Sequence, residues 1–132
     1  MRDTLYPSPL LRMALLGDAA ASAAVGLLLT LAATPLAGLL LLPEPLLRGA
    51  GLMLVPYAAL VAWLGLRTRL PRWSVWAVVA VNVLWVADSL LLLGFTAPSR
   101  LGIAFVLLQA TAVLGFAAAQ YAALRRPNAA GL

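Results

Sequence analysis

The chain has 132 residues, of which 64% are hydrophobic and only 10% are charged, and its mean hydropathy is +1.03. Soluble domains are about 45–50% apolar and about 25% charged, so this composition excludes a water-soluble globule and also a disordered chain. The net charge of +5 comes from scattered arginines that form no basic stripe, and we therefore expect no nucleic-acid partner.

Few side chains in this sequence could carry chemistry. It has no Cys and no His, its nine basic residues are all Arg, and only four residues are acidic. These absences exclude thiolate and imidazole metal sites, Ser–His–Asp or Cys nucleophiles and Lys-based catalysis. We therefore expect no catalytic activity, no cofactor and no metal. An intramembrane enzyme that uses Asp18 or Asp88 as a general acid or base remains an alternative.

Long apolar stretches dominate the rest of the chain. A transmembrane helix needs about 20 mostly apolar residues, and four stretches between charges and Pro or Gly clusters meet this length. The period-two alternation of a β-barrel is absent, and an open sheet would leave backbone groups unpaired in lipid. The sequence therefore predicts an all-α, four-transmembrane-helix bundle. It would form a single integral membrane domain over 1–132, with helices at about 10–34, 46–66, 73–93 and 102–124.

The connection between the first two predicted helices is apolar but too short to span a membrane. Pro35 can begin a new helix but cannot continue the previous one, and Pro43 and Pro45 end the stretch. We expect a short interfacial helix here, on the outer leaflet. The corresponding connection between the third and fourth helices, residues 94–99, is only a turn.

The arginines predict the orientation of the helices. Two of them, Arg48 and Arg100, fall on one side of the predicted membrane, and seven fall on the side of the two termini: Arg2, Arg12, Arg67, Arg69, Arg72, Arg125 and Arg126. Because short cytoplasmic loops carry an excess of Arg and Lys, both termini are predicted to be cytoplasmic. This pattern is typical of a multi-pass protein of a bacterial-type cytoplasmic (inner) membrane.

Asp18 is the most informative polar residue of the first predicted helix. It lies roughly 12 Å from the start of that helix, where an exposed carboxylate would cost about 2.5–3.5 kcal/mol. A stripe of small or polar residues recurs at four-residue spacing along this helix: Ala14, Asp18, Ser22, Gly26 and Thr30. Such stripes allow close packing, so we expect Asp18 to face a neighbouring helix. It is either a proton- or cation-binding carboxyl or a protonated structural group.

Three further polar residues lie in the third and fourth predicted helices. Asp88 lies near the outer end of the third helix, and we expect it to form an ion pair with Arg48 or Arg100. Asn82 and Gln109 would serve as interhelical hydrogen-bonding groups. The alternative is a polar pocket between the first, third and fourth helices that holds Asp18, Ser22, Asn82 and Gln109.

Four helices in about 130 residues, with the acidic Asp18 in the first, resemble the small multidrug resistance transporters in outline. The resemblance implies that an embedded carboxyl exchanges protons for cationic drugs. The resemblance covers only the number of helices and the acidic residue in the first of them. At the position of Asp18 that family has Glu. The surrounding residues 16–20 and the long connection through Pro43 also depart from the family.

These observations favour a small membrane protein without catalytic activity. We expect an accessory subunit, a scaffold, or a helical bundle that binds lipid or a hydrophobic ligand. Its partners would be the lipid bilayer and either a second copy or a partner subunit. A proton-coupled small-molecule transporter that uses Asp18 is the alternative function.

Overall fold

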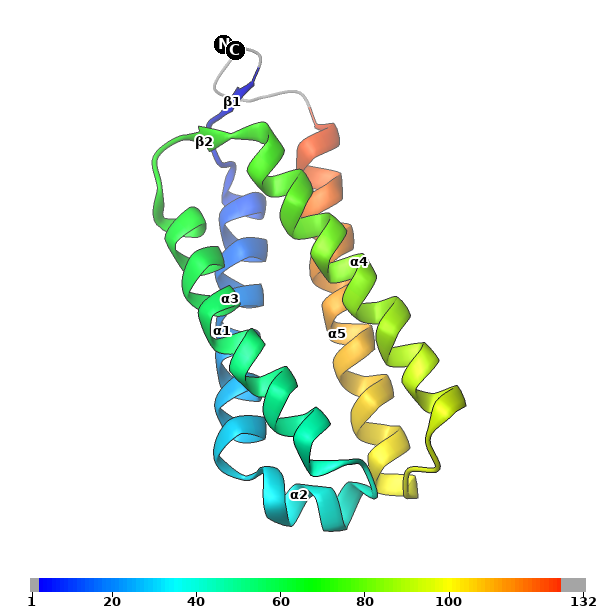
Figure 1. Ribbon diagram of the computed structural model, residues 1–132. Helices are drawn as coiled ribbons and strands as arrows, with labels where there is room; N and C mark the ends of the chain where they lie inside the picture. Colours follow the sequence, from blue (N-terminus) through cyan, green and yellow to red (C-terminus); the bar gives the residue numbers. More distant parts are fainter. Residues whose placement is uncertain (1–2, 127–132) are drawn as a thin grey trace.

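The computed structural model describes residues 3–126, and these residues are almost entirely helical (Figure 1). Two short strands and five helices follow one another along the described chain: β1 (Thr4–Leu5), α1 (Pro9–Leu31), α2 (Ala33–Leu40), α3 (Glu44–Leu66), β2 (Leu70–Pro71), α4 (Arg72–Phe95) and α5 (Arg100–Arg125). Four of the helices, α1, α3, α4 and α5, are long and apolar enough to cross a membrane. The prediction of an α-helical chain with four apolar spans is therefore confirmed.

Serine side chains cap the N-terminal ends of two of the long helices, α1 and α5. The Ser8 hydroxyl accepts a hydrogen bond from the Leu11 backbone N–H (3.1 Å) at the start of α1. The Ser99 hydroxyl accepts one from the Gly102 N–H (3.0 Å) at the start of α5. Such N-caps satisfy backbone donors that have no partner within the helix. The observed helix ends lie within a few residues of the predicted ones.

The connection between α1 and α3 does contain a short helix. It begins at Ala33, so Pro35 lies in its first turn, where proline is tolerated. The helix α2 ends where Leu41 adopts a left-handed backbone conformation, with φ of 54°. Ser99, in the turn between α4 and α5, donates two hydrogen bonds to α2. Its hydroxyl donates to the carbonyl of Leu39 (2.7 Å), and its backbone N–H donates to that of Leu40 (2.9 Å).

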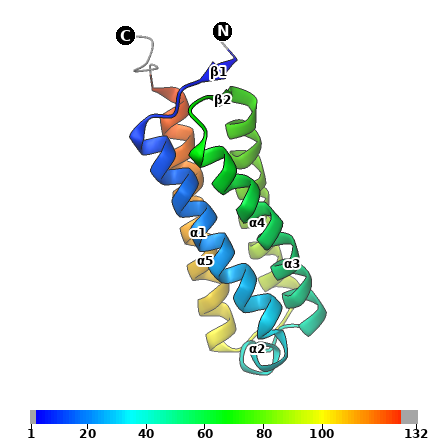
Figure 2. The same cartoon turned by 90° about the vertical axis from the view of Figure 1, so that its left-hand side faces the viewer.

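The four long helices form two hairpins that lie side by side (Figures 1 and 2). The first hairpin pairs α1 with α3, the second pairs α4 with α5, and α1 also packs against α5. Two glycines allow α1 and α3 to approach closely: a Cβ added to Gly51 would lie 2.7 Å from the carbonyl oxygen of Gly26. No comparable contact joins α3 to α4.

The end at which α1 begins and α5 ends is closed by backbone pairing and by arginines. The strands β1 and β2 pair antiparallel, a feature that the sequence analysis did not predict. Arg12 donates to the carbonyl of Gly65 (2.6 Å) and Arg72 to that of Leu124 (3.2 Å), near the C-terminal ends of α3 and α5. Cationic groups at these positions satisfy free carbonyls and complement the helix dipole.

Two apolar clusters divide the interior along the helix axes. The first lies towards β1 and β2 and includes Leu15, Val61 and Val75, whereas the second lies towards α2 and includes Leu29 and Leu47. The buried polar side chains of the middle helix turns lie between the two clusters. This polar layer holds the candidate site.

Candidate functional site

The buried carboxyl group of Asp18, near the middle of α1, is within hydrogen-bonding distance of side chains from all four long helices. Its Oδ2 accepts hydrogen bonds from the amide nitrogens of Asn82 on α4 (2.9 Å) and Gln120 on α5 (3.0 Å). The hydroxyl of Tyr57 on α3 lies 3.3 Å from the same oxygen. The other oxygen, Oδ1, accepts a hydrogen bond from Ser22 (3.2 Å). We call these five residues the Asp18 cluster.

The members of the Asp18 cluster also bind one another. The nearest acceptor to the Tyr57 hydroxyl is Asn82 Oδ1, at 2.8 Å. The Asn82 amide donates to Gln120 Oε1 (3.1 Å), and the Gln120 amide reaches the carbonyl of Ala14 (3.5 Å). In the described part of the chain, every buried side-chain N or O atom has a hydrogen-bond partner. Each polar atom of the cluster that is buried thus has at least one partner, and the resulting network fixes its side chains in one arrangement.

The carboxyl of Asp18 is buried without a cationic partner. Asp18, Asn82 and Gln120 are 1%, 3% and 0% exposed. Within residues 3–126, the one ion pair joins Arg48 to Glu44, at 3.2 Å on the surface. Neutral donors are thus the groups that offset the desolvation of this carboxyl, and a carboxylate can accept about four such hydrogen bonds.

Local sequence explains how α1 and α3 present these groups. Residues four apart lie on the same face of a helix, so Ser22 stands one turn beyond Asp18 and reaches Oδ1. In α3, Pro56 lies inside the helix next to Tyr57. Proline has no N–H, so the helix loses one backbone hydrogen bond at this turn, and such turns commonly bend the helix.

A second group of polar side chains joins α4 to α5, closer to α2. The indole N–H of Trp85 donates to Gln109 Oε1 (2.6 Å), and the Gln109 amide donates to Ser89 Oγ (3.0 Å). The Ser89 hydroxyl donates to the Trp85 carbonyl (2.8 Å). This group connects only the second hairpin, whereas the Asp18 cluster connects both hairpins.

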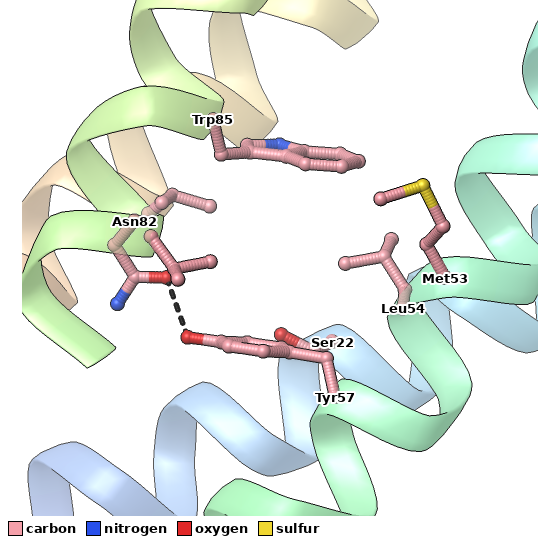
Figure 3. A pocket seen from close by; sticks show the side chains of 8 residues that line it. Ser22, Met53, Leu54, Tyr57, Asn82 and Trp85 are labelled. Carbon is pink, nitrogen blue, oxygen red and sulfur yellow. Dashed lines mark hydrogen bonds between the residues drawn. The ribbon is translucent and has the colours of Figure 1, made fainter. Parts of the chain in front are cut away.

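Two clefts lie between the hairpins beside the Asp18 cluster. The first, the α3–α4 cleft, has a volume of about 100 Å³, and Figure 3 shows Trp85 and Tyr57 on opposite walls with Met53 and Leu54 between them. The second, the α1–α5 cleft, has a volume of about 200 Å³ and is lined by Asp18 and by the aromatic side chains of Trp85, Phe105 and Phe116. Four residues line both clefts: Ser22, Leu54, Trp85 and Val113.

The structure brings together three of the predicted site residues, Asp18, Ser22 and Asn82. Gln109 lines the α1–α5 cleft with Asp18, but the glutamine that binds the carboxyl is Gln120. The sequence placed Gln109 in a polar pocket with Asp18, and neither Gln120 nor Tyr57 was among the predicted site residues. The position of Tyr57 beside a proline within a span was the signal that could have indicated it.

The ion pair expected for Asp88 is not formed. Its side chain is exposed on α4 and has neither a hydrogen bond nor an ion pair with any described residue. Arg48 contacts Glu44 instead, because these two residues lie one helical turn apart in α3. Asp88 thus lies apart from the Asp18 cluster.

The described residues contain no group of three or more His, Cys, Asp or Glu side chains that could hold a metal ion. Comparison with protein-family models, with curated proteins and with solved structures found no match to this chain. The clefts and the Asp18 cluster are therefore the features of the chain that bear on its function.

Proposed function

We propose that this chain is a non-catalytic, multi-pass membrane protein that binds a hydrophobic ligand, such as a lipid acyl chain, between its two hairpins. The observation that carries the proposal is the pair of clefts that meet at Ser22, Leu54, Trp85 and Val113. Ligand sites in proteins are typically concave, mostly apolar and furnished with a few polar groups that fix orientation. Both clefts have this composition.

The position of the clefts favours a ligand that enters from the bilayer. Met53 and Val81 line the α3–α4 cleft and are exposed, and Leu108 does the same in the α1–α5 cleft. The clefts therefore open on the sides of the helices, where lipid tails would surround a membrane protein. A flexible alkyl chain matches narrow apolar openings of this kind.

The same proposal includes an orientation in a bacterial-type cytoplasmic membrane. Arg12, Arg67, Arg72 and Arg125 lie at or near the helix ends beside β1 and β2, so this end would face the cytoplasm. The helix α2 would then lie at the outer interface. Arg2 belongs to this pattern in the sequence but is outside the described residues.

Native mass spectrometry of the protein released from lipid nanodiscs tests ligand binding. Val113 lines both clefts, so Val113→Phe should fill them and reduce the amount of retained lipid or added fatty alcohol. Leu114→Phe is the matched control, because Leu114 is exposed beside it on α5. Equal retention by the two variants would contradict the proposal.

Proton-coupled transport is the second candidate function, and it is favoured by the burial of Asp18 next to the α1–α5 cleft. An embedded acidic residue that lines a cavity is a common feature of proton relays. In reconstituted vesicles, a substrate-driven proton flux that Asp18→Asn abolishes would support this function. An equal flux in the variant would exclude a role of Asp18 in coupling.

A further inference from the structure

The carboxylate of Asp18 has an uneven set of hydrogen-bond donors. Two amide nitrogens and the nearby Tyr57 hydroxyl surround Oδ2, whereas Oδ1 accepts a hydrogen bond from Ser22 alone. A carboxylate offers about four acceptor positions, two on each oxygen. Oδ1 therefore has capacity for one further donor.

Ser22 places this remaining capacity beside the clefts. It lines both of them, and its hydroxyl donates to Asp18 Oδ1. A hydroxyl oxygen can accept hydrogen bonds while it donates one. A donor group that approaches through the α1–α5 cleft, which Asp18 also lines, would thus find two acceptors, the oxygens of Ser22 and Asp18, at one place.

Charge favours a cationic donor at this place. No Arg among residues 3–126 forms an ion pair with Asp18, so an ammonium group would bring the cationic partner that this carboxyl lacks, and such charge-assisted hydrogen bonds are stronger than neutral ones. The walls also suit a cation, because Trp85 and Phe116 line the α1–α5 cleft together with Asp18. Trp85 continues into the α3–α4 cleft, where its ring faces that of Tyr57 (Figure 3). Aromatic faces attract ammonium groups.

We infer that the hydrophobic ligand carries a primary ammonium group, which would donate to Asp18 Oδ1 and Ser22 Oγ while its alkyl chain occupies the clefts. This inference rests on the proposed function, since it requires a ligand between the hairpins. It adds the charge of the ligand and the atoms that recognise it.

Three amphiphiles with the same ten-carbon chain test the inference: decylammonium, decanol and decanoate. Their binding can be followed by the fluorescence of Trp85, after the other three tryptophans have been replaced by Phe, in nanodiscs of zwitterionic lipid. Decylammonium should bind at least about tenfold more tightly than decanol, and decanoate more weakly than either. Equal affinities of decylammonium and decanol would overturn the inference.

Substitutions at the two membrane-embedded carboxyls provide a matched pair. Asp18→Asn should bring the affinities for decylammonium and decanol to within about threefold of each other, because the removed charge is the source of the preference. Asp88→Asn removes an exposed carboxyl outside the clefts and should keep the preference. Loss of the preference in both variants, or in neither, would overturn the inference.

Ser22→Val offers a second variant if Asp18→Asn does not elute as a monodisperse protein. It keeps the carboxyl but removes the acceptor between Asp18 and the clefts, so it should reduce decylammonium binding and spare decanol binding. Equal reductions for the two compounds would count against the inference. The proposed function fails separately, if neither compound gives saturable binding that Val113→Phe weakens.

Discussion

The surroundings of Asp18 and of Asp88 differ sharply, although both carboxyls lie within apolar helices. Asp18 is 1% exposed and contacts donors from all four long helices, whereas Asp88 is exposed on α4 and contacts no described polar partner. Asp88 lies seven residues before the end of α4, which places it about 10 Å along the axis from that helix end. Burial with neutral partners therefore defines a site at Asp18 and not at Asp88.

The largest expected effect follows from replacement of the buried carboxyl by an apolar group. Asp18→Leu removes the acceptor of the Asn82 and Gln120 amides and leaves buried donors unpaired, which we expect to lower the free energy of unfolding by about 2–4 kcal/mol. Reversible unfolding in mixed micelles, followed by tryptophan fluorescence, measures this change. Asp88→Leu is the control, and an equal loss of stability in both variants would remove the distinction between the two regions.

Asn82→Leu should have the next largest effect. The Asn82 amide links Asp18, Tyr57 and Gln120, so its removal separates α4 from the other members of the Asp18 cluster. We expect a loss of about 1–3 kcal/mol in the same unfolding measurement. Val83→Leu, on the neighbouring exposed position of α4, should change stability by less than about 0.5 kcal/mol. Similar losses in the two variants would show that the cluster does not hold the hairpins together.

Tyr57→Phe should have a smaller effect, because it removes one hydroxyl and keeps the ring in the cleft wall. The lost hydrogen bond to Asn82 predicts a decrease of about 0.5–1.5 kcal/mol. Tyr121→Phe removes an exposed hydroxyl that accepts from Arg125 and should be nearly neutral. A larger loss at Tyr121 than at Tyr57 would contradict the assigned role of Tyr57.

Asp88→Asn should have the smallest effect. The side chain has no described partner, so we expect the free energy of unfolding to change by less than about 0.5 kcal/mol. A loss above about 1 kcal/mol would indicate that Asp88 contributes to stability as a paired carboxyl does.

The spans and the inward face of α1 could be predicted because they depend on local sequence. Apolar length indicated four long helices, and the four-residue stripe placed Asp18 and Ser22 on the buried face. The contact of Gln120 with Asp18 could not be predicted, because it depends on how far α5 is shifted along α1. That shift is set by packing between residues more than one hundred positions apart in the chain.

Two other features were not predicted. The paired strands give no periodic signal in the sequence, and two acidic residues could have paired with Arg48. The strands β1 and β2 have only two residues each, which is too short for alternation to be recognised. Asp88 was expected to pair with Arg48 or Arg100, but Arg48 pairs with Glu44, which lies one helical turn away in α3. An acidic partner one turn away on the same helix is within reach of Arg48 whatever the packing between helices.

Quenching of Trp85 by a brominated alkyl chain tests ligand binding between the hairpins most directly. Trp85 lines both clefts, whereas Trp63 is exposed on α3 outside them, so proteins that retain only one of these tryptophans form a matched pair. We predict that quenching of Trp85 saturates and is reversed by the unbrominated chain, while quenching of Trp63 rises steadily with the brominated fraction. Identical, non-saturating quenching at both positions would contradict ligand binding in the clefts.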